Sequence, residues 1–298
     1  MSQTEDIASP PWGSLPVEQY LLRKWDHSSH LSVEEQREAL VNAFVQEDDI
    51  SAFASPVNES PSIEMQALTQ NVLMPWRPQK LRQIAEKYSP RDPLFGKIIV
   101  LRTYYGGDSD QKFTRWIQDA TEAFEEMDPD GNLFGQPEER FWCVLDDPSI
   151  FDRGSEKWQS VYSILPELAT PALKRGFNDR DVREVQDLIS SVRDSREPEE
   201  DDYEDAVCVI AMVRFWLIVF DEEAFKDDEL LLVFMDKKGN VVRQAGIDPA
   251  DLPNLPHYNL RGSITESGFW CNAEVGKKYK TRGQIMRAVL PLVMDESE

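Results

Sequence analysis

The chain has 298 residues, and its 55 Asp and Glu against 32 Lys and Arg give a formal net charge of −23. Hydrophobic residues make up 41%, which suffices for one large domain or for a domain with an appendage. The acidic balance argues against binding to a nucleic acid, because affinity for a phosphate backbone comes from Lys and Arg. No apolar run reaches the about 18 residues of a membrane span, so no membrane partner is expected.

Residues 1–13 are polar and acidic, and we expect a flexible tail without the basic and apolar regions of a secretory signal. The three Cys (Cys143, Cys208 and Cys271) are far apart, and no pair has the spacing of metal ligands. A reduced, cytosolic or nuclear setting fits this pattern, and we expect a cytoplasmic protein.

Residues 14–92 carry helical patterns and predict a small all-helical N-terminal region. Ser32 and Glu35 have the spacing of a capping box, which is typical of a helix start. Another helix is expected over Ile63–Met74, and a further short one ends before the Pro-containing breaker Ser89–Pro93.

Residues 93–276 predict an α/β domain, because short apolar runs of strand type alternate with helical patterns. The clearest helical pattern runs from Phe113 to Met127, where apolar residues recur on one face. The alternation predicts a layered, mostly parallel sheet with flanking helices, parallel in its first part. The expected strands are Lys97–Leu101, Phe141–Leu145, Phe215–Phe220, Leu230–Met235 and Val241–Arg243, the last two joined as a hairpin.

Three further stretches have an unusual composition: one is acidic, one is apolar and one is basic. Residues 196–205 are dense in Asp and Glu and are expected to form a solvated acidic loop. Val207–Phe220 is the longest apolar run, and its part before Arg214 is either strand or helix. Residues 277–298 hold a basic stretch and a C-terminal helix. The basic stretch either neutralises an acidic face of the same fold or meets a phosphate-bearing partner.

Polar residues at the predicted strand ends are the candidate binding site, because ligands of open α/β sheets sit at the carboxyl ends of strands. Arg102 follows a buried run directly, and its guanidinium suits a carboxylate or a phosphate. We expect an internal ion pair with Asp146 or Asp147. The alternative is an external anion held by Arg102 and the helix N-terminus near Ser109. The complete candidate set is Arg102, Thr103, Ser109, Asp146, Asp147 and Asp221, with the three Asp as possible groups for a metal or a proton transfer.

Other motifs are incomplete. The Asp128–Glu139 segment has acidic spacing like that of a calcium loop, but Leu133 stands where the loop needs Gly. His27 and His30 lie in an expected loop, and nothing in the sequence brings Cys271 and His257 together. The sequence therefore predicts no metal and no cofactor.

Several short segments occur in the order Ile-Val-Leu-Arg102-Thr103, Trp116, Val-Leu-Asp146-Asp147-Pro148, Leu-Ile-Val-Phe-Asp221, Leu-Leu-Val-Phe-Met-Asp236 and Asn259-Leu260. This order resembles a group of uncharacterised bacterial and fungal α/β domains of unknown function, over roughly residues 96–265. The chain departs from that group at Tyr104-Tyr105 and by the acidic insertion 196–205. The resemblance implies an α/β fold and supplies no activity and no catalytic residue.

Two functions follow as hypotheses. The first is a non-catalytic cytosolic protein that binds another macromolecule, most simply a protein, because no catalytic or cofactor motif is complete. The second is a small-molecule enzyme, or an anion- or metal-dependent ligand-binder, with its site at the strand carboxyl ends. The sequence leaves open whether the protein is an enzyme.

Overall fold

The computed structural model describes residues 10–54, 62–88, 98–127, 142–212, 216–255, 258 and 264–294. The chain divides into two units, and the first combines Met1–Leu94 with Gln159–Gly176 and Lys237–Gly239. The second contains Phe95–Trp158, Phe177–Asp236 and Asn240–Glu298. The sequence predicts one boundary near residue 92, and the composition of the two later segments of unit 1 does not indicate that they belong to it.

The described part of unit 1 is built mainly from helices. The capping box is confirmed, because the Ser32 side chain accepts from the Glu35 N–H and the Glu35 carboxylate accepts from the Ser32 N–H. A single β-bridge joins Asp49 to Lys174. The helical elements are α1 (Pro16–Lys24), α2 (Val33–Gln46), η1 (Ser51–Phe53), α3 (Ile63–Leu68), η2 (Thr69–Leu73), α4 (Met74–Trp76), α5 (Gln79–Lys87), η4 (Trp158–Ser163) and η5 (Pro166–Ala169).

Two buried ion pairs hold α5 and the residue Arg77, which follows α4, within unit 1. The Arg77 guanidinium makes two parallel bonds of 3.0 and 2.5 Å to the Glu167 carboxylate in η5. The Arg82 guanidinium makes bonds of 2.6 and 3.0 Å to Glu18 in α1. All four side chains are at most 2% exposed. Such pairs link segments that are distant in sequence, since each charge needs its partner once water is excluded.

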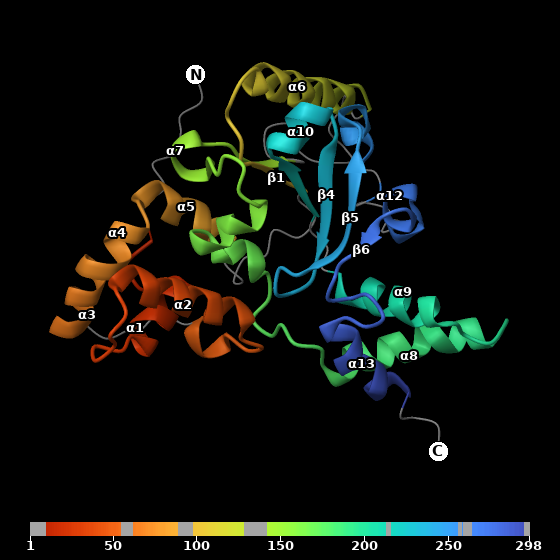
Figure 1. Ribbon diagram of the computed structural model, residues 1–298, viewed down its shortest axis with the longest axis horizontal. Helices are drawn as coiled ribbons and strands as arrows, with labels where there is room; N and C mark the ends of the chain where they lie inside the picture. Colours follow the sequence, from red (N-terminus) through yellow and green to blue (C-terminus); the bar gives the residue numbers. More distant parts are fainter. Residues whose placement is uncertain are drawn as a thin grey trace. The chain divides into compact units, whose positions relative to one another are not determined.

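Unit 2 contains a six-stranded mixed sheet in the order β2-β1-β3-β4-β5-β6 (Figure 1). β1 (Ile98–Arg102) lies between β2 (Trp142–Leu145) and β3 (Trp216–Phe220) and is parallel to both. β4 (Leu230–Met235) is antiparallel to β3, β5 (Val241–Ile247) to β4, and the two-residue β6 (Glu274–Val275) to β5.

The prediction of a mostly parallel sheet is therefore wrong, although the fold is α/β as expected. Parallel neighbours need a crossover of roughly a dozen residues or more. Between β3 and β4 the chain forms only α10 (Glu222–Asp227), and a tight turn joins β4 to β5. These short connections return the chain in the opposite direction.

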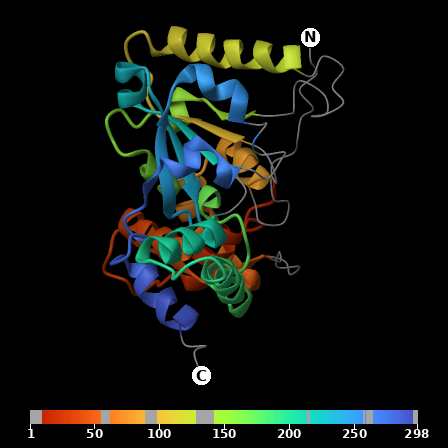
Figure 2. The same ribbon diagram turned by 90° about the vertical axis from the view of Figure 1, so that its right-hand side faces the viewer.

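The helices of unit 2 bury one face of the sheet. α6 (Ser109–Met127) contributes Phe113, Trp116 and Ala120 to a large core shared with alternate residues of β1, β3 and β4. Figures 1 and 2 show α8, α9 and α13 side by side. The remaining bounds are α7 (Pro148–Phe151), α8 (Asp179–Arg193), α9 (Glu200–Ala211), η6 (Pro249–Asn254), η7 (Ile264–Glu266), α12 (Gly268–Cys271) and α13 (Gln284–Met294).

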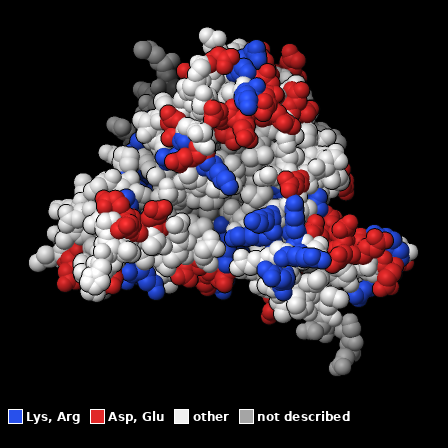
Figure 3. All heavy atoms as spheres, viewed as in Figure 1, with Lys and Arg blue, Asp and Glu red and all other residues white. Residues whose placement is uncertain are grey.

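The prediction of an acidic loop over residues 196–205 is wrong, because α9 begins at Glu200. Glu199 and Asp202 form a reciprocal cap, and Arg196 pairs with the Asp202 carboxylate at 2.6 Å. Carboxylates are favoured in a first helical turn by the helix dipole, so the like charges here stabilise the helix start. Figure 3 shows acidic side chains over α9 next to Lys and Arg over the segment between β6 and α13.

The long apolar run divides between two elements. Its first part belongs to α9, which ends at Ala211, and β3 begins at Trp216. Arg214 and Phe215 lie outside the described residues. None of the helices in the described part of the chain is both long and apolar enough to cross a membrane.

Candidate functional site

The carboxyl end of β1 brings together three of the predicted site residues. Arg102 is the last residue of β1 and lies opposite Phe220 of β3. A short turn then leads to Ser109, where α6 begins. The Arg102 side chain is only 4% exposed, so its charge must be satisfied inside the protein.

The Arg102 guanidinium is held by four groups of unit 2. Its Nε donates to the carbonyl oxygen of Tyr104 at 3.0 Å. One terminal nitrogen donates to Ser109 Oγ at 2.9 Å and to the Asp110 carboxylate. The other terminal nitrogen lies 3.5 Å from Asp146 Oδ1. The expected internal pair with Asp146 is thus present, but the nearer carboxylate is that of Asp110.

Aromatic rings enclose the same guanidinium. Its central carbon lies 4.3 Å from the ring centre of Tyr105, 4.9 Å from that of Phe113 and 5.6 Å from that of Phe225. Rings of this kind attract a desolvated cation and exclude water from it. Burial, followed by the nearby Asp146 carboxylate, raises the pKa of Tyr105 above its usual range. The Tyr105 hydroxyl therefore stays protonated and donates to the Arg102 carbonyl at 3.2 Å.

The other predicted site residues cap helices or form hydrogen bonds with the backbone. Asp147 caps α7 by accepting from the Ser149 N–H at 2.9 Å, and Asp221 caps α10 by accepting from the Ala224 N–H at 3.0 Å. Thr103 is fully buried, and its N–H donates to the Phe220 carbonyl at 3.0 Å. The Thr103 hydroxyl has no hydrogen-bond partner among the described residues.

This edge of the sheet has little capacity left for an external anion. Three of the five guanidinium N–H groups of Arg102 are bonded within the protein, and a fourth faces Asp146. Two of the predicted carboxylates are occupied as helix caps. No group of three metal-binding side chains gathers in the described part of the chain.

A second feature of unit 2 is a hollow of about 590 Å³ beside β5. It lies where β5 extends beyond the short strand β6, which pairs only with Arg243 and Gln244. Because backbone groups alternate along a strand, those of Gly246 point to the same side as those of Gln244, past the end of β6. The lining residues are Leu231, Gln244, Ala245, Gly246, Tyr258, Gly268, Phe269, Asn272 and Glu274.

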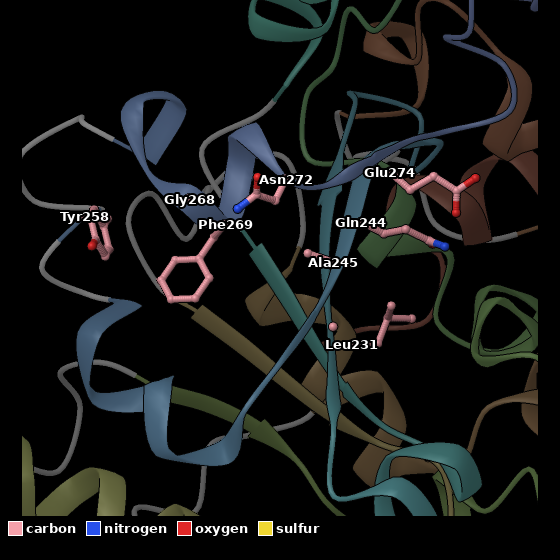
Figure 4. A pocket seen from close by; sticks show the side chains of 9 residues that line it. Leu231, Gln244, Ala245, Tyr258, Gly268, Phe269, Asn272 and Glu274 are labelled. Atoms are coloured by element: carbon pink, nitrogen blue, oxygen red, sulfur yellow. The ribbon is translucent and has the colours of Figure 1, made fainter.

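The walls of this hollow combine apolar and polar groups. Tyr258 and Phe269 form an edge-to-face ring pair with centres 5.7 Å apart. In Figure 4 the Gln244 and Glu274 side chains point the same way from neighbouring strands, as expected for a cross-strand pair. Glu274 is in turn bonded by Lys280 Nζ at 2.9 Å.

No protein-family model, no curated protein and no solved structure matches the chain. The resemblance to uncharacterised α/β domains therefore remains an expectation from the quoted segments.

The weaker sequence motifs add no further site among the residues that the structure describes. The calcium-like segment Asp128–Glu139 and His257 lie outside the described residues. His27 and His30 are exposed, and the neighbouring Asp26 carboxylate is used by Ser28, whose N–H and hydroxyl donate to it at 2.8 and 2.6 Å. None of the three Cys forms a disulfide, and burial raises the pKa of Cys208 to about 12.

Sequence reasoning missed Asp110 and the hollow. Asp110 stands in the first turn of α6, one residue from the predicted Ser109, so the helix start itself was the available signal. The hollow is built from β4, β5, β6, α12 with the following Asn272, and Tyr258, and no single segment marks it.

Proposed function

We propose that this is a non-catalytic protein that binds a short extended segment of a partner protein in the hollow beside β5. The observation that carries the proposal is the contrast in unit 2 between the internally bonded polar groups at the β1 edge and this hollow at a sheet edge. A cytoplasmic location, and binding to protein in preference to nucleic acid or membrane, belong to the same proposal.

The groups that line the hollow suit an extended peptide. No described strand pairs with the outer side of Ala245–Ile247, and exposed strand edges commonly accept an added strand. The ring pair of Tyr258 and Phe269 offers apolar surface for a side chain of the partner. The amide groups of Gln244 and Asn272 can bond a peptide backbone.

The alternative function, an enzyme or ligand-binder at the strand carboxyl ends, would use Arg102, Asp146 and Asp221. The bonds already made by Arg102 and Asp221 argue against it. A thermal-shift screen with nucleotides, phosphosugars and divalent ions tests it, since a ligand of the native state raises Tm. A reproducible shift that Asp146→Asn abolishes would favour the alternative.

The proposed function is tested by selecting peptides of about ten residues, the length of a long strand, from a random library. Selected peptides should bind the full chain, and Phe269→Ala should weaken them by roughly tenfold or more, because it removes a ring of the hollow. Leu188→Ala, which truncates an exposed Leu on α8, is the matched control and should leave binding unchanged.

Hydrogen exchange on the wild-type chain makes this test independent of the stability of the variant. Selected peptides should slow amide exchange in the segment Gln244–Ile247, chiefly at Gly246, whose N–H points past the end of β6. Peptides that bind without protecting these amides, or a library that yields no binder, would contradict the proposed function.

A further inference from the structure

The segment Lys277–Arg287, here called the basic segment, differs in charge from the rest of the molecule. It contains Lys277, Lys278, Lys280, Arg282 and Arg287 and no acidic residue, within a chain of net charge −23. Figure 3 shows Lys and Arg side chains gathered over this part of unit 2. A local positive field on an acidic protein attracts negatively charged partners to one place.

Part of this charge is used internally. Lys280 Nζ bonds the Glu274 carboxylate at 2.9 Å, and Lys278 Nζ bonds the neutral side-chain oxygen of Asn240 at 2.6 Å. Lys277, Arg282 and Arg287 are exposed, and none of them has an ion-pair or hydrogen-bond partner from its side chain among the described residues. Three cations therefore remain available to a partner, unlike the enclosed Arg102.

The backbone below these cations is firmly held. The N–H and hydroxyl of Thr281 both donate to Glu204 of α9, at 2.7 and 3.1 Å. The buried Tyr279 hydroxyl donates to Asp236 at 2.7 Å, and burial raises the pKa of Tyr279 well above its usual range. A side chain at Gly276 would meet the Val241 carbonyl oxygen at 1.9 Å, so the turn approaches β5 as closely as only Gly permits. A preordered surface of this kind loses less entropy when a partner binds.

The basic segment is continuous with the hollow. Glu274 lines the hollow and is bonded by Lys280, and the chain runs from Glu274 to Lys277 through only two residues. β6 runs away from the hollow, because Val275 pairs with Arg243 and the Gly276 N–H donates to the Val242 carbonyl. A peptide that leaves the hollow along the outer edge of β6 would pass towards Lys277 and Arg282, which follow β6 in the chain. Resting on the proposed function, we infer that the bound segment is acidic and that its Asp or Glu side chains pair with Lys277, Arg282 and Arg287.

The same charges disfavour a nucleic acid. The basic segment lies beside α9, whose first turn holds Glu200, Asp201 and Asp202. A long polyanion tracking across this surface would meet those carboxylates, and the chain as a whole repels it. A short acidic peptide can place its charges on the basic segment alone.

The test compares three labelled peptides of about ten residues in which Val alternates with Glu, Gln or Lys. Fluorescence anisotropy on the full chain should show the Glu peptide binding roughly tenfold more tightly than the Gln peptide, with the Lys peptide weakest. The preference for Glu should shrink between about 50 and about 300 mM salt, because salt screens exposed charges.

Charge reversal localises the effect. Lys277→Glu with Arg282→Glu should abolish the preference for the Glu peptide. The matched control, Arg115→Glu with Lys157→Glu, changes two exposed cations elsewhere in unit 2 and gives the same net charge. The control should keep most of the preference. If the reversal lowers Tm, Lys277→Gln with Arg282→Gln replaces it and should still reduce the preference.

Three results would overturn this inference, and the first two would leave the proposed function standing. The first is equal binding of the Glu and Gln peptides together with protection of Gln244–Ile247. The second is equal loss of preference in the reversal variant and its matched control. Tighter binding of a single-stranded oligonucleotide than of the Glu peptide would also overturn it. Absence of any peptide binding at the hollow would instead remove the proposed function itself.

Discussion

Arg102 and Arg282 carry the same guanidinium in opposite surroundings within unit 2. Arg102 is buried at the end of β1, bonded to Ser109 and Asp110 and enclosed by three rings. Arg282 is exposed in the basic segment and has no carboxylate partner among the described residues. One cation holds the fold together, and the other is free to meet something outside it.

The position of an arginine on a sheet therefore does not decide whether it binds a ligand. The carboxyl end of β1 is where an α/β sheet most often holds an anion. Here nearby groups of the protein itself fill that role, because Asp110 and Asp146 lie within reach of Arg102. A charge that binds a partner is expected where no group of the protein pairs with it.

The largest loss of stability is expected where both partners of an ion pair are buried, as for Arg77 and Glu167 in unit 1. Arg77→Met should destabilise the protein by about 3–5 kcal/mol, because it leaves the Glu167 carboxylate buried without a countercharge. Urea denaturation measures the change. Arg77→Met combined with Glu167→Leu should recover a large part of the loss, since no charge then remains buried. A single variant as stable as wild type would show that this pair is not sequestered from water.

Arg102→Ala removes the enclosed guanidinium and should lower stability less than Arg77→Met does. We expect a loss of about 2 kcal/mol, mainly from lost packing against the rings, because the Asp110 left behind is 78% exposed and can be hydrated. Arg102→Met keeps most of the packing and should cost less. An unchanged urea midpoint for Arg102→Ala in phosphate-free buffer would instead revive an anion-binding role for this edge.

Lys277→Ala with Arg282→Ala removes two exposed cations of the basic segment and should change stability least. Both side chains are exposed without described partners, so we expect Tm to stay within about 2 °C of wild type. Differential scanning calorimetry checks this. A clear fall in Tm would mean that the basic segment has a structural role, and the contrast with Arg102 would disappear.

Local signals in the sequence predicted several elements well. The apolar periodicity from Phe113 onward predicted α6, the Ser32–Glu35 spacing predicted the start of α2, and the turn between Met235 and Val241 predicted the β4–β5 hairpin. These features depend on neighbours within a few residues of each other. Arg102 was also placed correctly at the end of a buried strand.

Features that depend on distant partners were missed. Charge density alone predicts a loop for the acidic residues of α9, because the packing of Val207 and Cys208 into the core of unit 2 cannot be inferred from it. The direction of β4 depends on which strand it meets, and the hollow on where β6 stops. Each of these features can be predicted only when the residues that it contacts in the folded chain are known.

The central claim, that the β5 edge and the basic segment together bind an acidic extended segment, is tested most directly by hydrogen exchange. The full chain would be measured with and without the Glu-containing peptide. We predict slowed exchange over Gln244–Ile247 and over Glu274–Arg282, and unchanged exchange over Arg102–Asp110. Slowed exchange confined to Arg102–Asp110, or no change in any of these segments at saturating peptide, would contradict the claim.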